Sequence, residues 1–468
     1  MDGAWPLEPD AETLREMTQL VSEFVVDHVA SLAEQPSFDL DGVEAVRASF
    51  REGVPECGRP LATLLERLRQ AIAKSYNTAG PGYLAYIPGG GIYASALAGL
   101  IASATNRYVG VSQPAPALAE IETIAVRWLA ELMGYPGSAR GILTSGGSLS
   151  NFSALVTARS ERLGDDLAGG VLYASAETHH CVAKAARLAG LPPAAMRSLP
   201  TDARLRLRPE ALEAAVREDH AAGRRPFLVV ANVGTTNTGA VDPLPEIARI
   251  AREHGLWLHA DAAYGGFFRL ATNGPALVPG LEACDSITLD PHKGLFMPYG
   301  LGALLVRDAS ALARAHGGGA AYVQDVTEDG SLGFADLSPE LSREFRGLRL
   351  WLPLALYGIA PFRAQLDEKL ALARWAHERL REHPRFELLD EPQLSVVAFR
   401  LRAPDAEAER LGPELLQRVN ARRRVFLSST RVAGRYALRL CVLSFRTHAE
   451  RVREAVDSLC EEAAALVG

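Results

Sequence analysis

The chain has 468 residues, enough to bury a sizeable core and to form more than one domain. Hydrophobic residues make up 48% and charged residues 22%, the composition of an ordinary globular protein. The formal net charge of −7 argues against a general binder of nucleic acid or anionic membrane, which needs a basic face. We therefore expect neither nucleic acid nor a membrane among the partners of this chain.

Residues 1–88 are predicted to form a helical arm. Apolar side chains recur in helical register over residues 11–33, and a second helix is expected over residues 61–73. Two helices offer too little apolar surface for a core of their own. We therefore expect their apolar face to dock on a second subunit, so that the chain forms a homodimer.

Residues 89–355 are predicted to form a large α/β domain. β-rich runs alternate there with helical stretches such as residues 209–222 and 243–254. Strand and helix in alternation indicate crossover units and a mainly parallel sheet that is buried on both faces. The expected strands cover residues 141–144, 171–174, 227–231, 256–260, 286–289 and 301–306.

A long connection follows the last of these strands. Residues 315–340 contain the glycine triplet 317–319 and then Tyr322, with little periodicity. A connection of that length in a compact domain is typical of a lid over a site or of a disordered segment. Beyond it, a helical stretch near residues 351–380 leads into a small C-terminal α+β domain, which we place at residues 356–468.

The cysteines indicate a reducing compartment. There are five, an odd number, and no two of them form a C-x-x-C pair. This pattern favours reduced thiols over a disulfide framework or a zinc site. Residues 1–10 show neither the basic flank nor the apolar stretch of a secretory signal. We expect a cytoplasmic chain without a metal site.

Lys293 is one of only four lysines in a chain with forty-five arginines. An amine can lose its proton and form an imine with an aldehyde, whereas a guanidinium stays protonated. A lysine kept in so arginine-rich a chain therefore points to chemistry that arginine cannot perform. A single lysine could also be a chance survivor on a solvated face, so the argument depends on its neighbours.

Three further segments offer groups that one ligand could use. Asp261 ends an apolar strand, where side chains of a parallel sheet open into a crevice. Residues 144–151 carry two glycines ahead of a helix, and a helix N-terminus binds anions. His179 follows another strand and could stack on a flat ring, fill the core or bind a metal. Taken singly, Asp261 is more typical of a helix cap or a turn, and the glycines of a plain strand-to-helix turn.

Pyridoxal 5'-phosphate matches these groups together. Its aldehyde condenses with a lysine, its phosphate suits a helix N-terminus, and an aspartate keeps its pyridine nitrogen protonated so that the ring accepts electrons. The combination of Lys293, Asp261 and the glycine turn therefore predicts pyridoxal phosphate as the cofactor.

Six separated motifs follow one another along the chain. They are Gly82-Tyr83-Leu84-Ala85-Tyr86-Ile87-Pro88, the turn at 145–148, His179, Gly234-Thr235-Thr236, His259-Ala260-Asp261-Ala262-Ala263-Tyr264 and Pro291-His292-Lys293. In this order they resemble the group II pyridoxal-phosphate-dependent amino-acid decarboxylases, and the resemblance continues to Arg439-Leu440. It implies the fold type I architecture of the aspartate aminotransferase-like enzymes and an active site at the interface of a homodimer.

The resemblance assigns a role to each matching residue. Lys293 corresponds to the lysine that binds the cofactor covalently, Asp261 to the partner of the pyridine nitrogen, and His179 to the histidine stacked on the ring. Tyr322 corresponds to the tyrosine of a mobile loop that reaches across the dimer and helps to return the proton. These four are the expected catalytic residues. The other cofactor contacts implied are Gly146, Gly147, Ser148, Thr236, Ala263, Asp290 and His292.

The chain departs in two places from the family members that act on aromatic amino acids. Asp290 stands where they have asparagine near the phosphate, and an anion beside a dianion is unfavourable unless it is turned away or hydrogen-bonded. The expected substrate contacts are Tyr86, Pro88, Val109 and Val111. Tyr86 is retained, whereas the two valines stand where those enzymes mostly use larger groups.

These features predict a decarboxylase that converts an L-amino acid with an uncharged, aromatic side chain into an amine and carbon dioxide. No cluster of Arg or Glu near Tyr86 offers a partner for a charged side chain. Because the two valines are smaller than the groups at these positions in the aromatic enzymes, bulky aliphatic amino acids such as leucine and valine stay open as substrates. An oxygen-dependent aldehyde synthase is the other alternative, although such relatives tend to lose the loop tyrosine or the stacking histidine, and this chain keeps Tyr322 and His179.

Overall fold

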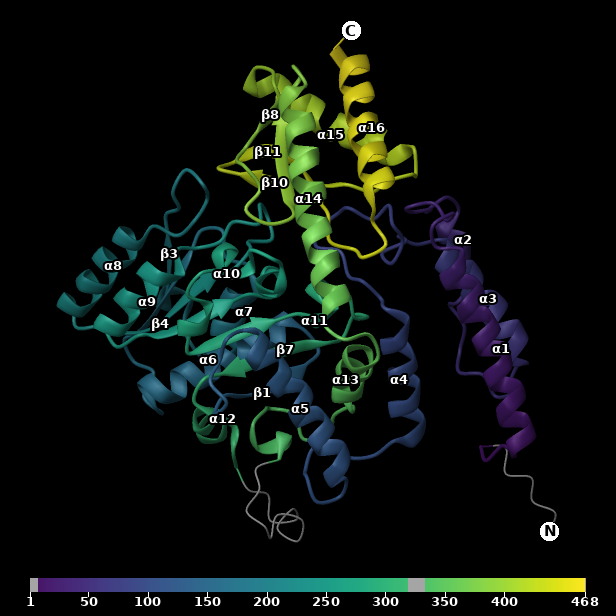
Figure 1. Ribbon diagram of the computed structural model, residues 1–468, viewed down its shortest axis with the longest axis horizontal. Coiled ribbons are helices and arrows are strands. Elements are labelled where there is room, and N and C mark those ends of the chain that lie inside the picture. Colours follow the sequence, from purple (N-terminus) through teal and green to yellow (C-terminus); the bar gives the residue numbers. More distant parts are fainter. Residues whose placement is uncertain (1–6, 319–332, 468) are drawn as a thin grey trace.

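Seven strands form the main sheet of the computed structural model, which describes residues 7–318 and 333–467 (Figure 1). Their order across the sheet is β1-β7-β6-β5-β4-β2-β3. Neighbouring strands are parallel except at β7, which runs antiparallel to both β1 and β6, so the predicted mainly parallel sheet is confirmed. The bounds are β1 (Arg140–Thr144), β2 (Gly170–Ser175), β3 (Met196–Leu199), β4 (Arg225–Asn232), β5 (Trp257–Asp261), β6 (Ser286–Leu289) and β7 (Gly302–Val306).

The six strands expected from the sequence lie within two residues of their predicted ends. The seventh, β3, is absent from the prediction. It is the edge strand next to β2, it carries Arg197 and Ser198, and among its four residues only Leu199 is buried. A strand that buries so little has no apolar run to mark it.

Helices cover both faces of the sheet, because successive side chains of each strand point to opposite faces. In β4, Leu228 and Val230 pack into one layer, whereas Val229 and Ala231 pack into the other. The first layer contains α6 (Gly147–Leu163), α7 (Cys181–Leu188) and α12 (Ala309–His316). The second contains α5 (Pro116–Leu132), α8 (Pro209–Ala221), α9 (Leu244–Glu253) and α13 (Arg346–Tyr357).

A second, smaller sheet follows in the C-terminal part of the chain. Its strands pair antiparallel in the order β10-β11-β9-β8, and helices pack against it, which is the predicted small α+β unit. The long helix α14 joins the two units (Figure 1): Leu366 and Leu370 lie in the core of the large sheet, and Ala376 and Leu380 in the core of the small one. The elements are α14 (Ala360–Glu382), β8 (Phe386–Leu388), β9 (Val396–Leu401), α15 (Asp405–Ala421), β10 (Ser428–Val432), β11 (Arg435–Cys441) and α16 (Ala449–Val467).

The N-terminal helices stand apart from this body (Figure 1). They are α1 (Ala11–Ala30), α2 (Val43–Ser49) and α3 (Leu61–Ala73), and none of their residues is buried. Leu14 is 51% exposed and Leu68 is 46% exposed. Helix α4 (Tyr93–Thr105), beside the arm, likewise exposes Leu97, Leu100 and Ile101. The apolar stripe that predicted a docking arm therefore lies uncovered in a single chain.

The last part of the predicted arm returns to the body. Leu84 packs in the core of the small sheet, its N–H donates to the carbonyl of Phe426 at 3.0 Å, and its carbonyl accepts from the N–H of Cys441 at 2.9 Å. The motif that contains Tyr86 is thus held between the two units.

Short turns complete the chain. They are α10 (Gly274–Leu277), α11 (Pro291–Gly294), η1 (Pro193–Ala195), η2 (Gly266–Leu270), η3 (Leu281–Ala283) and η5 (Phe334–Asp336). Within residues 7–318 and 333–467, no helix combines the length and the hydropathy needed to cross a bilayer.

Candidate active site

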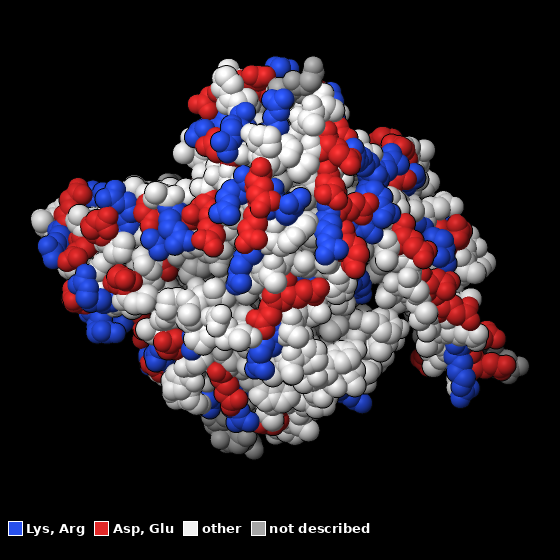
Figure 2. Space-filling view, turned by 45° about the horizontal axis from the view of Figure 1, so that its top comes forward, with Lys and Arg blue, Asp and Glu red and all other residues white. Residues whose placement is uncertain are grey.

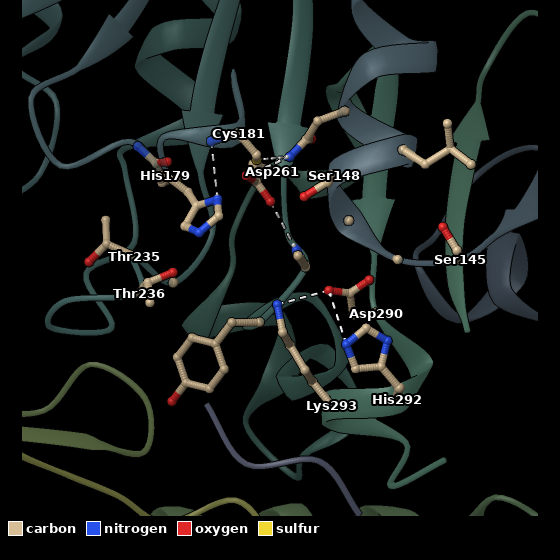
Figure 3. A pocket seen from close by; sticks show the side chains of 18 residues that line it. Ser145, Ser148, His179, Cys181, Thr235, Thr236, Asp261, Asp290, His292 and Lys293 are labelled. Carbon is tan, nitrogen blue, oxygen red and sulfur yellow. Dashed lines mark hydrogen bonds and ion pairs between the residues drawn. The ribbon is translucent and has the colours of Figure 1, made fainter. Parts of the chain in front are cut away.

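The carboxyl ends of the parallel strands carry polar side chains. Thr144 ends β1, Asn232 ends β4 and Asp261 ends β5, while Asp290 directly follows β6. Parallel neighbours end at one edge of the sheet, and the register places Asp261 beside both Asn232 and Thr288. A cavity of about 310 Å³ opens at this edge (Figure 3).

Every residue predicted to touch the cofactor lines this cavity. The fold brings them from the turn before α6, the loops after β2 and β4, the end of β5 and the turn α11. They are Gly146, Gly147, Ser148, His179, Thr236, Asp261, Ala263, Asp290, His292 and Lys293. Residues that are up to about 150 positions apart in the chain thus meet around one space, which is what a shared ligand requires.

The glycine turn leaves room that a side chain would fill. A Cβ atom on Gly147 would lie 3.1 Å from Oδ2 of Asp290 and 3.2 Å from Cβ of Ala263. One on Gly302, in strand β7, would come within 2.5 Å of the Cα atom of Gly146, so this strand position also requires glycine. Because α6 begins at Gly147, the N–H groups and the dipole of its first turn favour an anion here.

Lys293 lies in the one-turn helix α11, beside Asp290 (Figure 3). Its Nζ is 2.8 Å from Oδ2 of Asp290, and its side chain is 22% exposed. Burial disfavours the charged amine, but the charge and the hydrogen bond of Asp290 outweigh burial, so the pKa of Lys293 is raised. The lysine is therefore held as an ammonium in the chain without ligand.

A chain of hydrogen bonds fixes the carboxylate of Asp261. The Nδ2 amide of Asn151 donates to Oδ2 of Asp261 at 2.9 Å, and Oδ1 of Asn151 lies 2.8 Å from Nε2 of His259. An amide oxygen only accepts, so Nε2 of His259 carries the proton. Nδ1 of His259 then accepts from the hydroxyl of Ser286 at 2.8 Å, and this hydroxyl accepts from Nε1 of Trp257 at 2.8 Å.

Burial sets the protonation states of the side chains in this hydrogen-bonded series. It raises the pKa of the Asp261 carboxyl, while the nearby charge of Lys293 and the Asn151 hydrogen bond lower that pKa again. It also lowers the pKa of His259 to about 3, so this ring is neutral at physiological pH. The neutral His259 therefore serves as a fixed support for Asn151 and adds no charge to the site.

His179 follows β2 and faces the cavity (Figure 3). The backbone N–H of Cys181 donates to its Nδ1 at 3.3 Å, which leaves the proton of the neutral ring on Nε2. Burial lowers the pKa of His179, so the neutral form is favoured. A neutral, flat ring with one N–H suits stacking on an aromatic cofactor.

Asp290 does not turn away from the cavity. Its carboxylate is 2% exposed, pairs with Lys293 and lies 3.6 Å from Nε2 of His292. Its second oxygen, Oδ1, is buried and has no hydrogen-bond partner among the described residues. Lys293 therefore provides the compensation for this charge that the sequence alone could not identify.

The four predicted substrate contacts do not line the cavity within the described part of a single chain. Val109 and Val111 are buried, and Val109 packs with Ala115 and Phe345 in a small apolar cluster. Pro88 is buried as well, whereas Tyr86 is 58% exposed. Tyr322 lies outside the described residues, so its predicted role stays a prediction.

Tyr86 has a backbone conformation that few residues other than glycine adopt, with φ of 52°. Its N–H donates to Oγ of Ser428 at 3.0 Å, and its carbonyl accepts from Nη2 of Arg439 at 3.1 Å. Arg439 also donates to the carbonyls of Thr236 and Asn237. The small domain thus holds the Tyr86 turn and the Thr236 loop in a fixed relation to each other.

Sequence reasoning assigned no role to Asn151, His259, Ser286 or Arg439. A signal exists for two of them. His259 interrupts the apolar strand β5, and Arg439 interrupts the apolar strand β11, and a buried polar residue in such a strand demands partners. Asn151 and Ser286 are ordinary residues in sequence, and only the packing of α6 on β5 and β6 reveals what they contact.

The cavity fits pyridoxal phosphate. Gly146 and Gly147 leave space at a helix N-terminus for a phosphate. Lys293 offers an amine, and Asp261 offers a buried carboxylate that is oriented by Asn151. The donor set of amine, carboxylate and imidazole therefore corresponds to the aldehyde, the ring nitrogen and the ring face of this cofactor.

Comparison with known proteins identifies the family. Residues 44–402 match the family model described as "Pyridoxal-dependent decarboxylase conserved domain". The chain belongs to the pyridoxal-dependent decarboxylase family. It is 32% identical to an aromatic-L-amino-acid decarboxylase from Bacillus atrophaeus over 467 residues, which cover 97% of each chain. It is 30% identical to a phenylacetaldehyde synthase from Arabidopsis thaliana, over 98% of this chain and 97% of the relative.

A solved structure extends this similarity to three dimensions. The crystal structure of an Oryza sativa TDC with PLP and tryptamine matches with a TM-score of 0.93 at 29% identity, over 98% of this chain and all of the other. The predicted fold type I architecture, the predicted cofactor and the predicted class of enzyme are thereby confirmed. The chain is a pyridoxal-phosphate-dependent amino-acid decarboxylase.

Proposed function

We propose that this decarboxylase acts on an L-amino acid with an uncharged, aromatic side chain and releases the corresponding amine and carbon dioxide. Relatives that span nearly the whole chain are named for aromatic-L-amino-acid, tyrosine and tryptophan decarboxylation. Two further similar proteins are a phenylacetaldehyde synthase and a TDC whose structure was solved with tryptamine. Both names refer to compounds with an aromatic ring.

The charge balance of the site carries this proposal. Lys293 is engaged by Asp290, and Asp261 by Asn151. Arg439 donates to backbone carbonyls and to the hydroxyl of Ser428. No charged group lining the cavity is therefore left over, within the described residues, for a charged substrate side chain. Burying such a charge without a partner is costly, so an uncharged side chain is favoured.

The roles proposed for the lining residues are those that the family resemblance implies, and their positions around one cavity support them. Lys293 binds the cofactor covalently and later releases the product, and Asp261 keeps the pyridine nitrogen protonated. Gly146, Gly147, Ser148 and His292 would hold the phosphate. When it is bound, pyridoxal phosphate supplies an electron sink for the electron pair left by carbon dioxide. His179 would lie on the ring face with its proton on Nε2, and it would assist Tyr322 in returning a proton to the substrate α-carbon.

Tyr322, with or without His179, is the proposed source of this proton. Substituting Tyr322→Phe is expected to keep the cofactor and to reduce amine formation, with aldehyde as the new product. Amine formation at the wild-type rate by this variant would assign the proton to another group, with His179 as the next residue to test.

We also propose a homodimer with the active site at the subunit interface, in the cytoplasm. The uncovered apolar faces of α1, α3 and α4 support the dimer. Figure 2 agrees, since the surface to the left of the arm is broadly free of charged side chains. The exposed Tyr86 side chain supports a substrate pocket that a second chain completes. The unpaired state of all five cysteines supports a reducing compartment.

The division into a helical arm (1–88), a large domain (89–355) and a small domain (356–468) also remains our proposal. The separate cores of the two sheets support it. The boundary at 355 falls in the last turn of α13, just before α14 crosses from one core to the other.

Two alternatives have their own support. The small side chains Val109 and Val111 leave bulky aliphatic amino acids possible as substrates, because size discrimination in apolar pockets is weak, at ~1–3 kcal/mol per methylene. The similarity to phenylacetaldehyde synthase supports an aldehyde-forming reaction that consumes oxygen.

One assay separates these possibilities. Release of carbon dioxide is measured for all twenty amino acids, and the products from the best substrates are tested for amine, aldehyde, ammonia and hydrogen peroxide. We expect carbon dioxide release to be fastest from tryptophan, tyrosine or dihydroxyphenylalanine, and we expect the amine to be the main product. A preference for glutamate, lysine or diaminobutyrate would overturn the substrate proposal and leave the class of enzyme unchanged.

A further inference from the structure

Asp290 lies between two basic groups of the proposed cofactor site. Its Oδ2 atom is 2.8 Å from Nζ of Lys293 and 3.6 Å from Nε2 of His292 (Figure 3). All three side chains come from one short stretch, the residue after β6 and the first turn of α11. A single carboxylate oxygen thus lies within ion-pair distance of two groups that can each carry a proton.

The state of the His292 ring follows from its other nitrogen. Nδ1 lies 2.8 Å from the carbonyl oxygen of Leu301, and a carbonyl only accepts, so Nδ1 carries a proton. In the neutral ring Nε2 is then a bare lone pair that faces a carboxylate. Such a contact is unfavourable until Nε2 gains a proton, after which it becomes an ion pair.

Asp290 has no other way to balance its charge. It is 2% exposed, and its Oδ1 atom is buried without a hydrogen-bond partner among the described residues. No other cation lies within 4 Å of its oxygens in that part of the chain. Other titratable groups interact with this cluster from a greater distance: His179 and Cys181 with Asp290, Asp261 with Lys293, and Arg349 with His292.

Without cofactor, the lysine holds the charge. Burial lowers the pKa of His292, while the Asp290 contact raises the pKa of Lys293 above its usual value despite burial. Lys293 must lose this extra proton before its amine can bond to the cofactor. The site therefore needs an acceptor for the proton as well as a new partner for Asp290.

We propose that Asp290 exchanges partners during cofactor loading, pairing with the Lys293 ammonium beforehand and with a protonated His292 afterwards. When the Lys293 nitrogen bonds to the aldehyde carbon of the cofactor, the aldehyde oxygen would leave as water with two of the three ammonium hydrogens, and the third proton would pass to Nε2 of His292. The three side chains sum to zero charge before and after, because only the position of the positive charge changes. The proposal rests on the proposed roles of Lys293 and His292, and it makes Asp290 a positioning residue. It also accounts for an aspartate at a position where the repulsion of a phosphate would otherwise be unfavourable.

The first experiment tests the ion pair in the cofactor-free protein. Lysines are labelled with trace acetic anhydride from pH 6 to 10, and the Lys293 peptide is followed by mass spectrometry. In Asp290→Asn the labelling curve of Lys293 is expected to move to lower pH, with roughly tenfold or more labelling at pH 7. Lys74, Lys184 and Lys369 serve as internal references because the chain has no other lysines.

The matched control is Asp285→Asn. Asp285 directly precedes the first residue of β6, whereas Asp290 directly follows the last. Asp285 accepts from the N–H of Leu258 at 2.7 Å and lies away from the cavity, so the Lys293 curve is expected to stay at its wild-type position. Identical Lys293 curves for wild type and Asp290→Asn would overturn the proposal at its first step.

The second experiment tests the transfer to His292. Pyridoxal phosphate is mixed with cofactor-free protein, and the rate of the absorbance change is measured from pH 6.5 to 9. We expect a shallow pH dependence for wild type, because the proton stays within the site. His292→Asn keeps a donor for Leu301 but cannot accept the proton, so its rate should rise about tenfold per pH unit. A wild-type profile for this variant would overturn the exchange.

The two experiments separate this proposal from the proposed residue roles. If wild-type protein failed to bond the cofactor through Lys293, the proposed role of Lys293 and the exchange would both be overturned. The labelling curves would still decide whether Asp290 and Lys293 form an ion pair. If the cofactor loads through Lys293 and the profiles of the variants match wild type, the role of Lys293 stands and the exchange is overturned.

Discussion

The charged groups of the cofactor cavity find partners within one chain, whereas the apolar face of the N-terminal arm finds none among the described residues. At the cavity, Asp261, Lys293 and His259 each have a partner within hydrogen-bond distance, and all of them come from the same protomer. On the arm, no residue of α1, α2 or α3 is buried, and leucines such as Leu14 and Leu68 face solvent. One region completes its interactions by folding, and the other leaves apolar surface for a partner.

The difference shows what each kind of interaction requires. Buried charges must be paired at the moment of folding, because an unpaired charge in the interior is costly. Apolar surface tolerates exposure at a cost that a second subunit can offset later. We therefore expect cofactor binding to survive loss of the dimer, and turnover to depend on both.

The largest effect is expected from Lys293→Ala. Without the amine no covalent bond to the cofactor forms, so the visible absorption band and turnover should both disappear, while the sedimentation of the protein stays unchanged. Lys184→Ala, on the exposed side of α7, is the matched control and should behave as wild type. A fully active Lys293→Ala protein would contradict the assignment of this site.

The arm is tested by placing charges on its apolar face. In the double variant Leu14→Asp and Leu68→Asp, the proposed interface would lose contacts worth roughly 1.5–3 kcal/mol for each leucine and would gain buried charge. Sedimentation should show monomers that still bind the cofactor and show its absorption band, but turn over little or no substrate.

The control for the arm adds the same two charges at Gln19 and Gln70, which are exposed polar residues of α1 and α3. This protein is expected to remain a dimer. If the leucine variant were an active monomer, the dimer would not be needed for catalysis. If it lost the cofactor as well, the cavity would depend on the second chain.

A smaller loss is expected from Asp261→Asn. The neutral amide no longer holds the ring nitrogen protonated, so the electron sink weakens and kcat should fall roughly 100-fold or more. The dimer should persist, and the absorption band should remain but shift. Retention of the wild-type rate would show that the ring nitrogen needs no anionic partner in this enzyme.

The smallest effect is expected from Asn151→Ala, which leaves Asp261 in place but removes its donor. Leaving buried polar groups without partners costs about 1–3 kcal/mol, so a rate loss of roughly tenfold is expected. The hydrogen bond of Asn151 lowers the pKa of Asp261, so its loss raises that pKa further. The acidic limb of the kcat/KM profile should therefore move to higher pH, since the ionised carboxylate is the active form.

The conservative variant Asn151→Gln completes this test. It retains an amide, so it should restore part of the rate and return the acidic limb towards its wild-type position. An unchanged acidic limb in Asn151→Ala would mean that this hydrogen bond does not tune Asp261.

Much of this molecule could be predicted from the sequence. The six strands with apolar runs were located, since burial on both faces leaves a continuous signal, whereas the edge strand β3 carries too few apolar residues to give one. The ten residues predicted to hold the cofactor were named from strand ends, a glycine turn and the family resemblance, and the fold brings all of them to one cavity. The substrate contacts remain predictions, because the four residues do not line the cavity in the described part of a single chain and depend on how two chains meet.

The sequence by itself determined the class of fold and the cofactor, because local patterns encode strand ends, helix starts and a reactive lysine, and it predicted which residues would hold that cofactor. Tertiary structure alone decided how those residues are tuned. It brought Asn151 into contact with both Asp261 and His259, and it paired Asp290 with Lys293. It also placed Arg439 where it donates to the carbonyl of Tyr86. The physical reason is that a charge in the interior depends on every group packed around it, and those groups are close in space and mostly distant in the chain.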